Sequence, residues 1–346
     1  MTNFSCPLPI MRHANIQLAH GSGGKLSADL IATMILPRFA NPALNRLNDQ
    51  AVLSLPPGRI AFSTDTYVVD PIFFPGGSIG DLAINGTIND VAMAGAMPLF
   101  LSVGLILEEG LAMETLHQVL VAMEQAAVKA GVSIVTGDTK VVPRGKCDKI
   151  FINTSGLGVV PDGLELDASN MRVGDQVILS GTVGDHGLAV LTSREQLSFR
   201  TQINSDTAAL HGLVGLMLKA SSQIRVLRDP TRGGVATTLN EFAASAGLGI
   251  VVEAASIPVR PAVRGACELL GIDPLTVANE GKLLVVVAAT DASRLLATMR
   301  GHELGREARI IGEVVDEHQG LVALRTELGV KIILEMPVAE QLPRIC

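Results

Sequence analysis

Short runs of alternating or continuous hydrophobic residues recur along the chain, and longer segments with helical periodicity lie between them. Four of these runs end at Gly, Asp or Pro and are predicted to be strands, at 60–64, 99–107, 133–136 and 149–160. Segment 111–130 is predicted to be a helix, because its apolar residues recur three and four positions apart. This alternation is typical of an α/β or α+β protein.

The periodicity lapses at 161–175 and then begins again, which marks a candidate domain boundary. The second series is predicted to contain strands at 176–180, 249–253 and 282–288, and helices at 235–246 and 262–270. We therefore expect an N-terminal domain at 15–160 and a C-terminal domain at 161–336. The last ten residues, 337–346, contain two prolines and little periodicity, so we expect a mobile tail.

Composition narrows the class of protein. The chain has 346 residues, with 27 Lys and Arg against 34 Asp and Glu, and this acidic balance argues against a nucleic-acid-binding surface. No apolar run approaches the roughly 20 residues that span a bilayer, and the N-terminus lacks a signal-peptide pattern. The four cysteines form no CxxC pair. We expect a cytoplasmic protein with reduced thiols that acts neither on nucleic acid nor at a membrane.

A glycine-rich segment, HGSGGK, precedes a predicted helix that runs to Leu30. The backbone amides of Gly21, Ser22, Gly23 and Gly24 could turn toward an anion at the start of that helix. The segment matches neither GxxxxGK[ST] nor GxGxxG, which excludes the P-loop and Rossmann motifs. A plain glycine turn is an equal alternative.

Two aspartates follow predicted strands: Asp65 comes directly after IAFST, and Asp138 follows the strand SIVT in the segment GDTK. Lys140 lies two residues beyond Asp138. Strand exits are where α/β proteins place ligands, although an aspartate there can equally cap a helix or stabilise a turn.

The predicted helix at 78–94 carries an unusual polar stripe. Asp81, Asn85 and Asn89 recur every four residues on an otherwise small and aliphatic segment, and Asp90 adjoins the last of them. A solvated helix face is the alternative, but such faces usually carry Lys, Glu and Arg. Short carboxylate and amide side chains are better suited to metal and phosphate oxygens, and Mg²⁺ bound to a nucleotide is the natural candidate.

Two further polar segments lie in the second half, RDPTRGG at 228–234 and NEGK at 279–282. Arg232 could contact a phosphate or a carboxamide, and Glu280 could be a metal ligand or a base; a loop with its own ion pair is the alternative for each. Cys346 is the last residue, where a thiol on a flexible tail could act as a tethered carrier. An accidental surface cysteine remains the other interpretation.

Together these segments resemble the HypE family of hydrogenase maturation factors (carbamoyl dehydratases), within the PurM-like superfamily of aminoimidazole-ribonucleotide synthetase and selenophosphate synthetase. The resemblance runs from about Asn15 to Cys346, and residues 1–14, with Cys6, form an extension outside it. The terminal PRIC points specifically to HypE. The matching segments are IQLAHGSGG, FSTDTYVVDPIFFPGG, NGTINDVA, LSVGLILEEGL, IVTGDTKVV, LRDPTRGGV, ANEGKLLVVV and PRIC.

The resemblance implies a two-domain α/β (α+β) fold. Strands of the N-terminal domain would join those of a second subunit in a homodimeric barrel, with ATP bound between that domain and the C-terminal α+β domain. It also implies that the carbamoyltransferase HypF places a carbamoyl group on the terminal cysteine. The chain would dehydrate this thiocarboxamide to a thiocyanate with ATP and Mg²⁺, and pass cyanide to iron on the HypC–HypD complex.

The match to the family motifs implies a role for individual residues. Cys346 would carry the substrate, Lys140 would stabilise the transferring phosphoryl group, and Glu280 would be a metal ligand or base. Asp65, Asp90 and Asp138 would bind the metal. The remaining residues expected to contact the nucleotide are Gly21, Ser22, Gly23, Gly24, Asn89, Thr139, Asp229 and Arg232.

Two other functions are compatible with these residues. One is a superfamily enzyme that phosphorylates a free small molecule, as selenophosphate synthetase does, but those enzymes usually carry Cys or Sec beside the glycine loop, where this chain has His20. The other is a non-enzymatic carrier that presents Cys346 to partners, which leaves the aspartate-rich helix unexplained.

Overall fold

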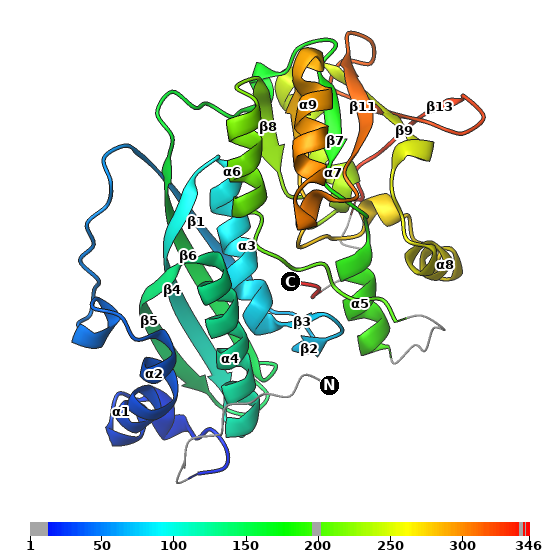
Figure 1. The fold of residues 1–346 in the computed structure, drawn as a ribbon. Helices are drawn as coiled ribbons and strands as arrows, with labels where there is room; N and C mark the ends of the chain where they lie inside the picture. The colour runs from blue at the N-terminus through cyan, green and yellow to red at the C-terminus, as the bar shows by residue number, and fades with distance from the viewer. Residues whose placement is uncertain (1–12, 196–201, 339–341, 343) are drawn as a thin grey trace.

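The computed structural model describes residues 13–195, 202–338, 342 and 344–346 (Figure 1). Cys6 and nearly all of the expected N-terminal extension lie outside these ranges. Within them, no helix combines the length and the apolar character needed to cross a membrane.

The N-terminal part of the chain forms a four-stranded sheet in the order β1-β6-β4-β5. β4 and β5 are parallel and the other neighbours are antiparallel. Two helices pack on one face of this sheet, where alternate residues such as Leu101, Leu105 and Ile152 are fully buried. The elements are β1 (Arg59–Tyr67), α3 (Ile79–Met93), β4 (Met97–Glu108), α4 (Met113–Ala130), β5 (Ser133–Val142) and β6 (Ile150–Val160), with the short pair β2 (Phe73–Phe74) and β3 (Gly77–Ser78) before α3.

The opposite face of the same sheet is open. Ile60 and Phe62 on β1 are 52% and 66% exposed, and Met97 and Ile106 on β4 are 53% and 42% exposed. Strand register places these residues on one surface. In a single chain the sheet therefore has one covered face and one apolar face in water, which is unusual for a stable domain.

A helical arm at the N-terminus covers the β5 edge of the sheet (Figure 1). The helix predicted to run to Leu30 is α1, which continues through a π-helical turn into α2. Arg38 of the arm bridges to Glu124 of α4, with 2.9 Å between Nη1 and Oε2. The arm comprises η1 (Leu18–Gly21), α1 (Lys25–Leu30), η2 (Ile31–Ile35), α2 (Leu36–Phe39) and η3 (Leu44–Arg46).

The C-terminal part forms a seven-stranded sheet in the order β13-β12-β9-β11-β7-β10-β8, in which only the β12–β9 pair is parallel. Its central strands are buried on both faces, with α7 on one side and α6 and α9 on the other. The strands are β7 (Gln176–Leu179), β8 (Ile224–Arg228), β9 (Gly249–Glu253), β10 (Leu284–Val287), β11 (Arg309–Val315), β12 (Val322–Arg325) and β13 (Lys331–Ile333). The helices are α5 (Asp185–Arg194), α6 (His211–Ala220), α7 (Gly234–Ala246), α8 (Pro261–Leu270) and α9 (Ala289–Arg300), with short turns η4 (Ala168–Asn170), η5 (Ala254–Ser256), η6 (Pro274–Thr276) and η7 (Glu303–Gly305).

Most strands and helices predicted by position are confirmed to within a few residues, as for the helix at 111–130, which is α4, and the strand at 249–253, which is β9. The strands predicted at 60–64 and 133–136 are longer, since they run to Tyr67 and Val142, so Asp65 and Asp138 lie within β1 and β5 and not after them as predicted. The sequence analysis did not predict α5, α6, α9, β8 or β11–β13. β12 and β13 are strands of four and three residues at one end of the sheet, stabilised by pairing with their neighbours, so their local sequence carries little signal of its own.

Candidate functional site

Four carboxylates from both halves of the chain converge where α3 faces the C-terminal sheet. Asp65 lies on β1, Asp90 on α3, Asp229 directly after β8, and Glu280 in the loop before β10. Asp90 acts electrostatically on both Asp229 and Glu280, and Asp65 acts on all three others. The structure therefore brings together four predicted site residues that are up to 215 positions apart in the sequence.

Burial and mutual repulsion disfavour negative charge on three of the four carboxylates. Burial raises the pKa of Asp90, and a hydrogen bond from Ser63 Oγ, 2.6 Å away, only partly opposes this. Burial and the neighbouring Asp90 raise the pKa of Asp229 to about 7. Burial, followed by Asp229 and Asp206, raises the pKa of Glu280 well above its usual value. Such a site favours a proton or a cation, because each charged carboxylate is both desolvated and repelled.

Two arginines act on the cluster. Arg228 and Arg232 both lower the pKa of Asp90. Arg228 also pairs with Glu241, with 2.5 Å between Nη1 and Oε2. Arg232 thus lies where the sequence predicted it, in the loop that leads from β8 into α7, and adds positive charge beside the carboxylates.

The rest of the polar stripe on α3 joins the two halves of the molecule. Asn89 is fully buried, and its Nδ2 donates to the carbonyls of Ala208 and Glu280 at 3.0 and 3.2 Å. Its Oδ1 accepts from the Leu210 amide at 2.8 Å. Asn85 donates to Thr207 Oγ1 at 3.3 Å. In this conformation the amide of Asn89 is fully used by backbone groups, so it fixes the position of Glu280 beside Asp90.

The glycine loop lies at the other edge of the N-terminal sheet. Together with Asp138, Thr139 and Lys140 of β5 it lines a cavity of about 500 Å³, whose walls are mostly apolar side chains of the arm, β4 and α4. Gly21 packs so tightly against the backbone of Val141 that a side chain there would clash. This cavity has the size and apolar character of a small-molecule site.

Within one chain this cavity and the carboxylate cluster are separate. β1 and β5 are the two edges of the sheet, about 14 Å apart across β6 and β4. Asp65 aligns with Thr154 and Val103 on the helix-covered face, whereas Asp138 aligns with Gly104 on the open face. The structure does not bring Asp138 to Asp65 and Asp90, because strand order and side-chain alternation separate them.

Asp138 and Lys140 also differ in environment from the cluster. Their side chains are 68% and 64% exposed and form an ion pair with 3.1 Å between Oδ2 and Nζ. The Asp138 carboxylate also accepts from the amide of Thr139 at 2.8 Å. The loop residues nearby are occupied within the loop, since Ser22 Oγ donates to the Ala19 carbonyl and the Gly23 amide donates to Ser27 Oγ.

The chain end lies against the start of the cluster. The amides of Val68 and Asp70 donate to the carbonyls of Cys346 and Arg344 at 3.2 and 3.3 Å, which pairs the terminus with the segment after β1. Val68 is three residues beyond Asp65, about 10 Å of extended chain. The end of the segment expected to be a mobile tail is docked here, because Ile345 buries its side chain.

The carboxylate oxygens of the cluster are ligands of the type that Mg²⁺ prefers. No group of three or more His, Cys, Asp or Glu side chains in the described ranges is arranged to hold a metal ion by itself. Mg²⁺ is usually held by one or two carboxylates together with substrate phosphates and water. Asp65 and Asp90 therefore fit a nucleotide-bound Mg²⁺, whereas Asp138 of the same chain lies too far away to join them.

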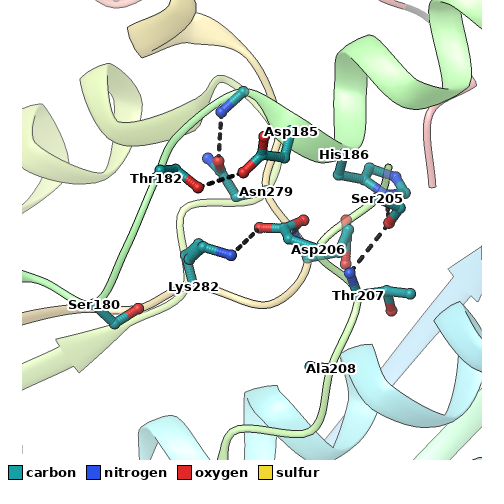
Figure 2. Close-up of polar contacts among 12 residues, drawn as sticks. Ser180, Thr182, Asp185, His186, Ser205, Asp206, Thr207, Ala208, Asn279 and Lys282 are labelled. Atoms are coloured by element: carbon teal, nitrogen blue, oxygen red, sulfur yellow. Dashed lines mark hydrogen bonds and ion pairs between the residues drawn. The ribbon is translucent and has the colours of Figure 1, made fainter. Parts of the chain in front are cut away.

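Several buried polar residues next to the cluster were not predicted from the sequence. Asp206 pairs with Lys282, with 3.0 Å between Oδ2 and Nζ (Figure 2), and its Oδ1 accepts from the Glu280 amide. Burial disfavours the Asp206 carboxylate, but Lys282 and His186 outweigh burial and lower its pKa. Asp206 lies in a segment without regular periodicity, so no local signal marked it.

Two protein-family models match this chain, one in its N-terminal part and one in its C-terminal part. Residues 47–160 match the N-terminal domain of AIR synthase related proteins, and residues 172–324 match their C-terminal domain. A carbamoyl dehydratase HypE from Cupriavidus necator is 54% identical over 341 residues, covering 98% of this chain and 97% of its own.

Solved structures of HypE proteins have the same fold as this chain. A crystal structure of hydrogenase maturation protein HypE in complex with ATP matches with a TM-score of 0.92 and 48% identity, covering 95% of this chain and 99% of that one. A HypE–HypF complex matches with a TM-score of 0.79 and 46% identity, covering 91% and 100%. The predicted PurM-like fold is therefore confirmed, and the chain belongs to the HypE carbamoyl dehydratases among the AIR synthase related proteins.

Proposed function

We propose that this chain is an ATP-dependent carbamoyl dehydratase that converts a thiocarboxamide on its own Cys346 into a thiocyanate, the source of cyanide for the iron of [NiFe]-hydrogenase. The observation that carries the proposal is the position of the chain end. Cys346 is paired with Val68, one short segment away from Asp65 and the buried carboxylates. A substrate on this sulfur would be delivered to that site without diffusing.

The chemistry requires an oxygen atom to leave carbon. Transfer of the γ-phosphoryl group of ATP to the carboxamide oxygen makes that oxygen part of a phosphate, which is a good leaving group. Loss of the phosphate and of both N–H protons leaves S–C≡N, with ADP and phosphate as the other products. Positioning and charge neutralisation dominate phosphoryl transfer, so cationic groups and a proton acceptor are the parts that the protein must supply.

The buried cluster supports these roles. Asp65 and Asp90 would hold the Mg²⁺ of the nucleotide, which neutralises phosphate charge, and Arg232 and Asp229 would line the same phosphates. The raised pKa of Glu280 makes its carboxylate a stronger proton acceptor than an ordinary glutamate, which suits removal of the N–H protons. We assign the base to Glu280 on this ground.

In this proposal, the remaining residues of each active site come from a second subunit. The open apolar face of the N-terminal sheet, with Phe62 and Met97 at its surface, has the character of a buried interface. Closing it against a second copy would allow Asp138, Thr139 and Lys140 of one chain, with the loop of Gly21, to serve the cluster of the other. The N-terminal domain, 15–160, is thus assigned both ATP binding and dimerisation.

Two partners complete the reaction sequence. HypF would supply the carbamoyl group, which is supported by the solved HypE–HypF complex of a relative that is 46% identical. The HypC–HypD complex would accept the cyanide at its iron. Both must reach Cys346, so the last three residues, Arg344–Cys346, have to leave their docked position between steps.

The test follows the mass of the C-terminal peptide. After incubation with HypF, carbamoyl phosphate and ATP, we expect Cys346 to gain one carbamoyl group and then to lose one water. Without ATP the carbamoyl form should accumulate. Carbamoylation with no loss of water in the presence of ATP would overturn the proposed activity.

A chain that lacks Cys346 separates the other two functions. A carbamoyl dehydratase without Cys346 still binds ATP but makes no product. An enzyme that acts on a free small molecule would retain both nucleotide binding and turnover, and a pure carrier would bind no nucleotide in either form.

A further inference from the structure

Helix α5 contacts the docked chain end from both of its own ends. His186 lies in its first turn and Arg194 is its last residue, and each bonds to a backbone carbonyl of the terminal three residues. Neither residue belongs to the carboxylate cluster. The proposed reaction does not explain why both ends of this helix bind the backbone of the chain end.

Arg194 joins the chain end to the segment after β1. Its Nη2 donates to the carbonyl of Arg344 at 2.6 Å, and its Nε donates to the carbonyl of Asp70 at 2.7 Å. Asp70 is the residue whose amide donates to the same Arg344 carbonyl. One guanidinium thus stabilises both strands of the pairing that holds the terminus, with charge-assisted hydrogen bonds on both sides.

His186 holds the next carbonyl. Its Nε2 lies 3.0 Å from the Ile345 oxygen, which can only accept, so Nε2 carries the proton. Its Nδ1 lies 2.8 Å from Ser205 Oγ, and that hydroxyl in turn accepts from the Thr207 amide (Figure 2). The ring is completely buried, and burial lowers its pKa, so it remains neutral with one tautomer fixed.

The surface of α5 is also shaped for the tail. Gly187 presents no side chain, and a Cβ there would lie 3.3 Å from Leu342 Cδ1 and closer still to Val277. Leu342 is 8% exposed and Ile345 is 1% exposed, and both join the hydrophobic core of the N-terminal part. The chain end thus contributes two apolar side chains to the core beside α5.

We infer that α5 is the docking element for the C-terminal tail, and that Arg194 and His186 are positioning residues that hold Cys346 at the inter-domain site. The inference rests on the proposed function for its biological meaning. Both residues bind backbone carbonyls and neither needs the sulfur to be free. The docked position is therefore open to the unmodified, carbamoylated and cyanated forms of Cys346 alike.

The same contacts connect docking to the candidate base. Ser205, which bonds to His186, is followed in the chain by Asp206, which pairs with Lys282 (Figure 2) and whose carboxylate accepts from the Glu280 amide. Two neighbouring residues thus connect the Ile345 carbonyl, through His186, with the backbone of Glu280. Docking of the tail and placement of Glu280 therefore share the segment Ser205–Asp206.

The test measures the reactivity of the Cys346 thiol in the full-length chain, without nucleotide or partner. In a Cys6→Ser background, N-ethylmaleimide labelling is followed by intact mass. We expect Arg194→Ala to speed the labelling of Cys346 about tenfold, which corresponds to about 1.4 kcal/mol in the docking equilibrium. Leu342→Ala, which changes only the tail, should act in the same direction, and Arg194→Lys should give an intermediate rate.

Arg264→Ala is the matched control, because Arg264 is an exposed arginine on α8. The buried thiols of Cys147 and Cys267 report general loosening. Unchanged labelling in both Arg194→Ala and Leu342→Ala would overturn the inference, and so would faster labelling of all three thiols together. Because no ATP is present, this result is independent of whether the chain is a dehydratase.

A second measurement separates positioning from a merely structural role. In Arg194→Ala the single-turnover loss of water from pre-carbamoylated chain should slow, while carbamoylation by HypF should be unchanged or faster. A decrease in both rates by the same factor would contradict a role in docking.

Discussion

The two candidate polar regions of the molecule contrast sharply. Asp229 and Glu280 are buried and Asp90 is partly buried; they come from both halves of the chain, and burial raises the pKa of each. Asp138 and Lys140 come from one strand, are mostly exposed, and pair with each other. Both regions were predicted from the same kind of signal, a carboxylate near a strand end or on an apolar helix.

The contrast separates a preorganised site from an incomplete one. The folded structure holds the carboxylates of the cluster close together although they repel one another. A cation or proton that binds there relieves this repulsion without further rearrangement of the protein. The exposed pair is solvated and contributes little by itself. It acquires a function only when another surface excludes water from it, which is the role that we assign to the second subunit.

The largest effect is expected at Asp90. Asp90→Asn keeps the shape of the side chain but removes one charge from the cluster, so ATP hydrolysis should fall by at least about 10³-fold, or about 4 kcal/mol of transition-state stabilisation. The fold and the carbamoylation of Cys346 should remain. ATP hydrolysis and circular dichroism check both points. A folded Asp90→Asn protein with normal hydrolysis would remove Asp90 from the site.

Glu280→Gln tests the base. Loss of the proton acceptor should slow the dehydration step about 10²–10⁴-fold in single-turnover experiments. Nucleotide binding should persist, and the melting temperature should not fall, because the variant relieves a buried like-charge contact. Glu268→Gln, at an exposed glutamate of α8, is the control. Equal dehydration rates for both variants would assign the base elsewhere.

Mixing two inactive variants tests whether the regions meet across a dimer. Glu280→Gln and Lys140→Ala would each inactivate both sites of a homodimer. If each site takes Glu280 from one chain and Lys140 from the other, half of the randomly mixed dimers regain one site, and activity recovers to about a quarter of wild type. Activity that stays at the level of the separate variants would mean that each chain builds its own site.

The smallest effect concerns pH. Burial lowers the pKa of His186, although the negative charge of Asp206 opposes this and Lys282 lies beyond it. Below about pH 6.5 the unfolded chain therefore binds a proton that the folded chain does not, and stability decreases as pH falls, by about 1 kcal/mol at pH 5.5. Urea unfolding at pH 7.5 and 5.5 measures this. His186→Asn should reduce the difference, and an unchanged pH dependence would show that His186 titrates normally.

Much of the fold could be predicted from the sequence because its signals are local. The apolar spacing of α4, the alternation of β1 and the polar stripe of α3 each reflect the burial of one face of one element. The chemistry of the cluster was also anticipated in part, since Asp65, Asp90, Asp229 and Glu280 stand out against apolar surroundings. What the sequence could not reveal is which of these residues share a site.

Strand order decides that question, and strand order depends on contacts between residues far apart in the chain. Asp65 and Asp138 occupy similar places in their local sequences, yet β1 and β5 are opposite edges of the sheet and the two side chains lie on opposite faces. Asp206, His186 and Arg194 lack any local pattern, because their partners are backbone groups of distant segments.

By itself, then, the sequence determined the elements, the residue types available for chemistry and the thiol at the end of the chain, since each depends on side chains a few positions apart. Tertiary structure alone decided that four carboxylates from both halves of the chain converge, that Lys140 lies away from them, and that the chain end pairs with the segment after β1 and is held by α5. These are properties of packing between distant segments, where burial and the direction of backbone hydrogen bonds, rather than residue type, set the energy.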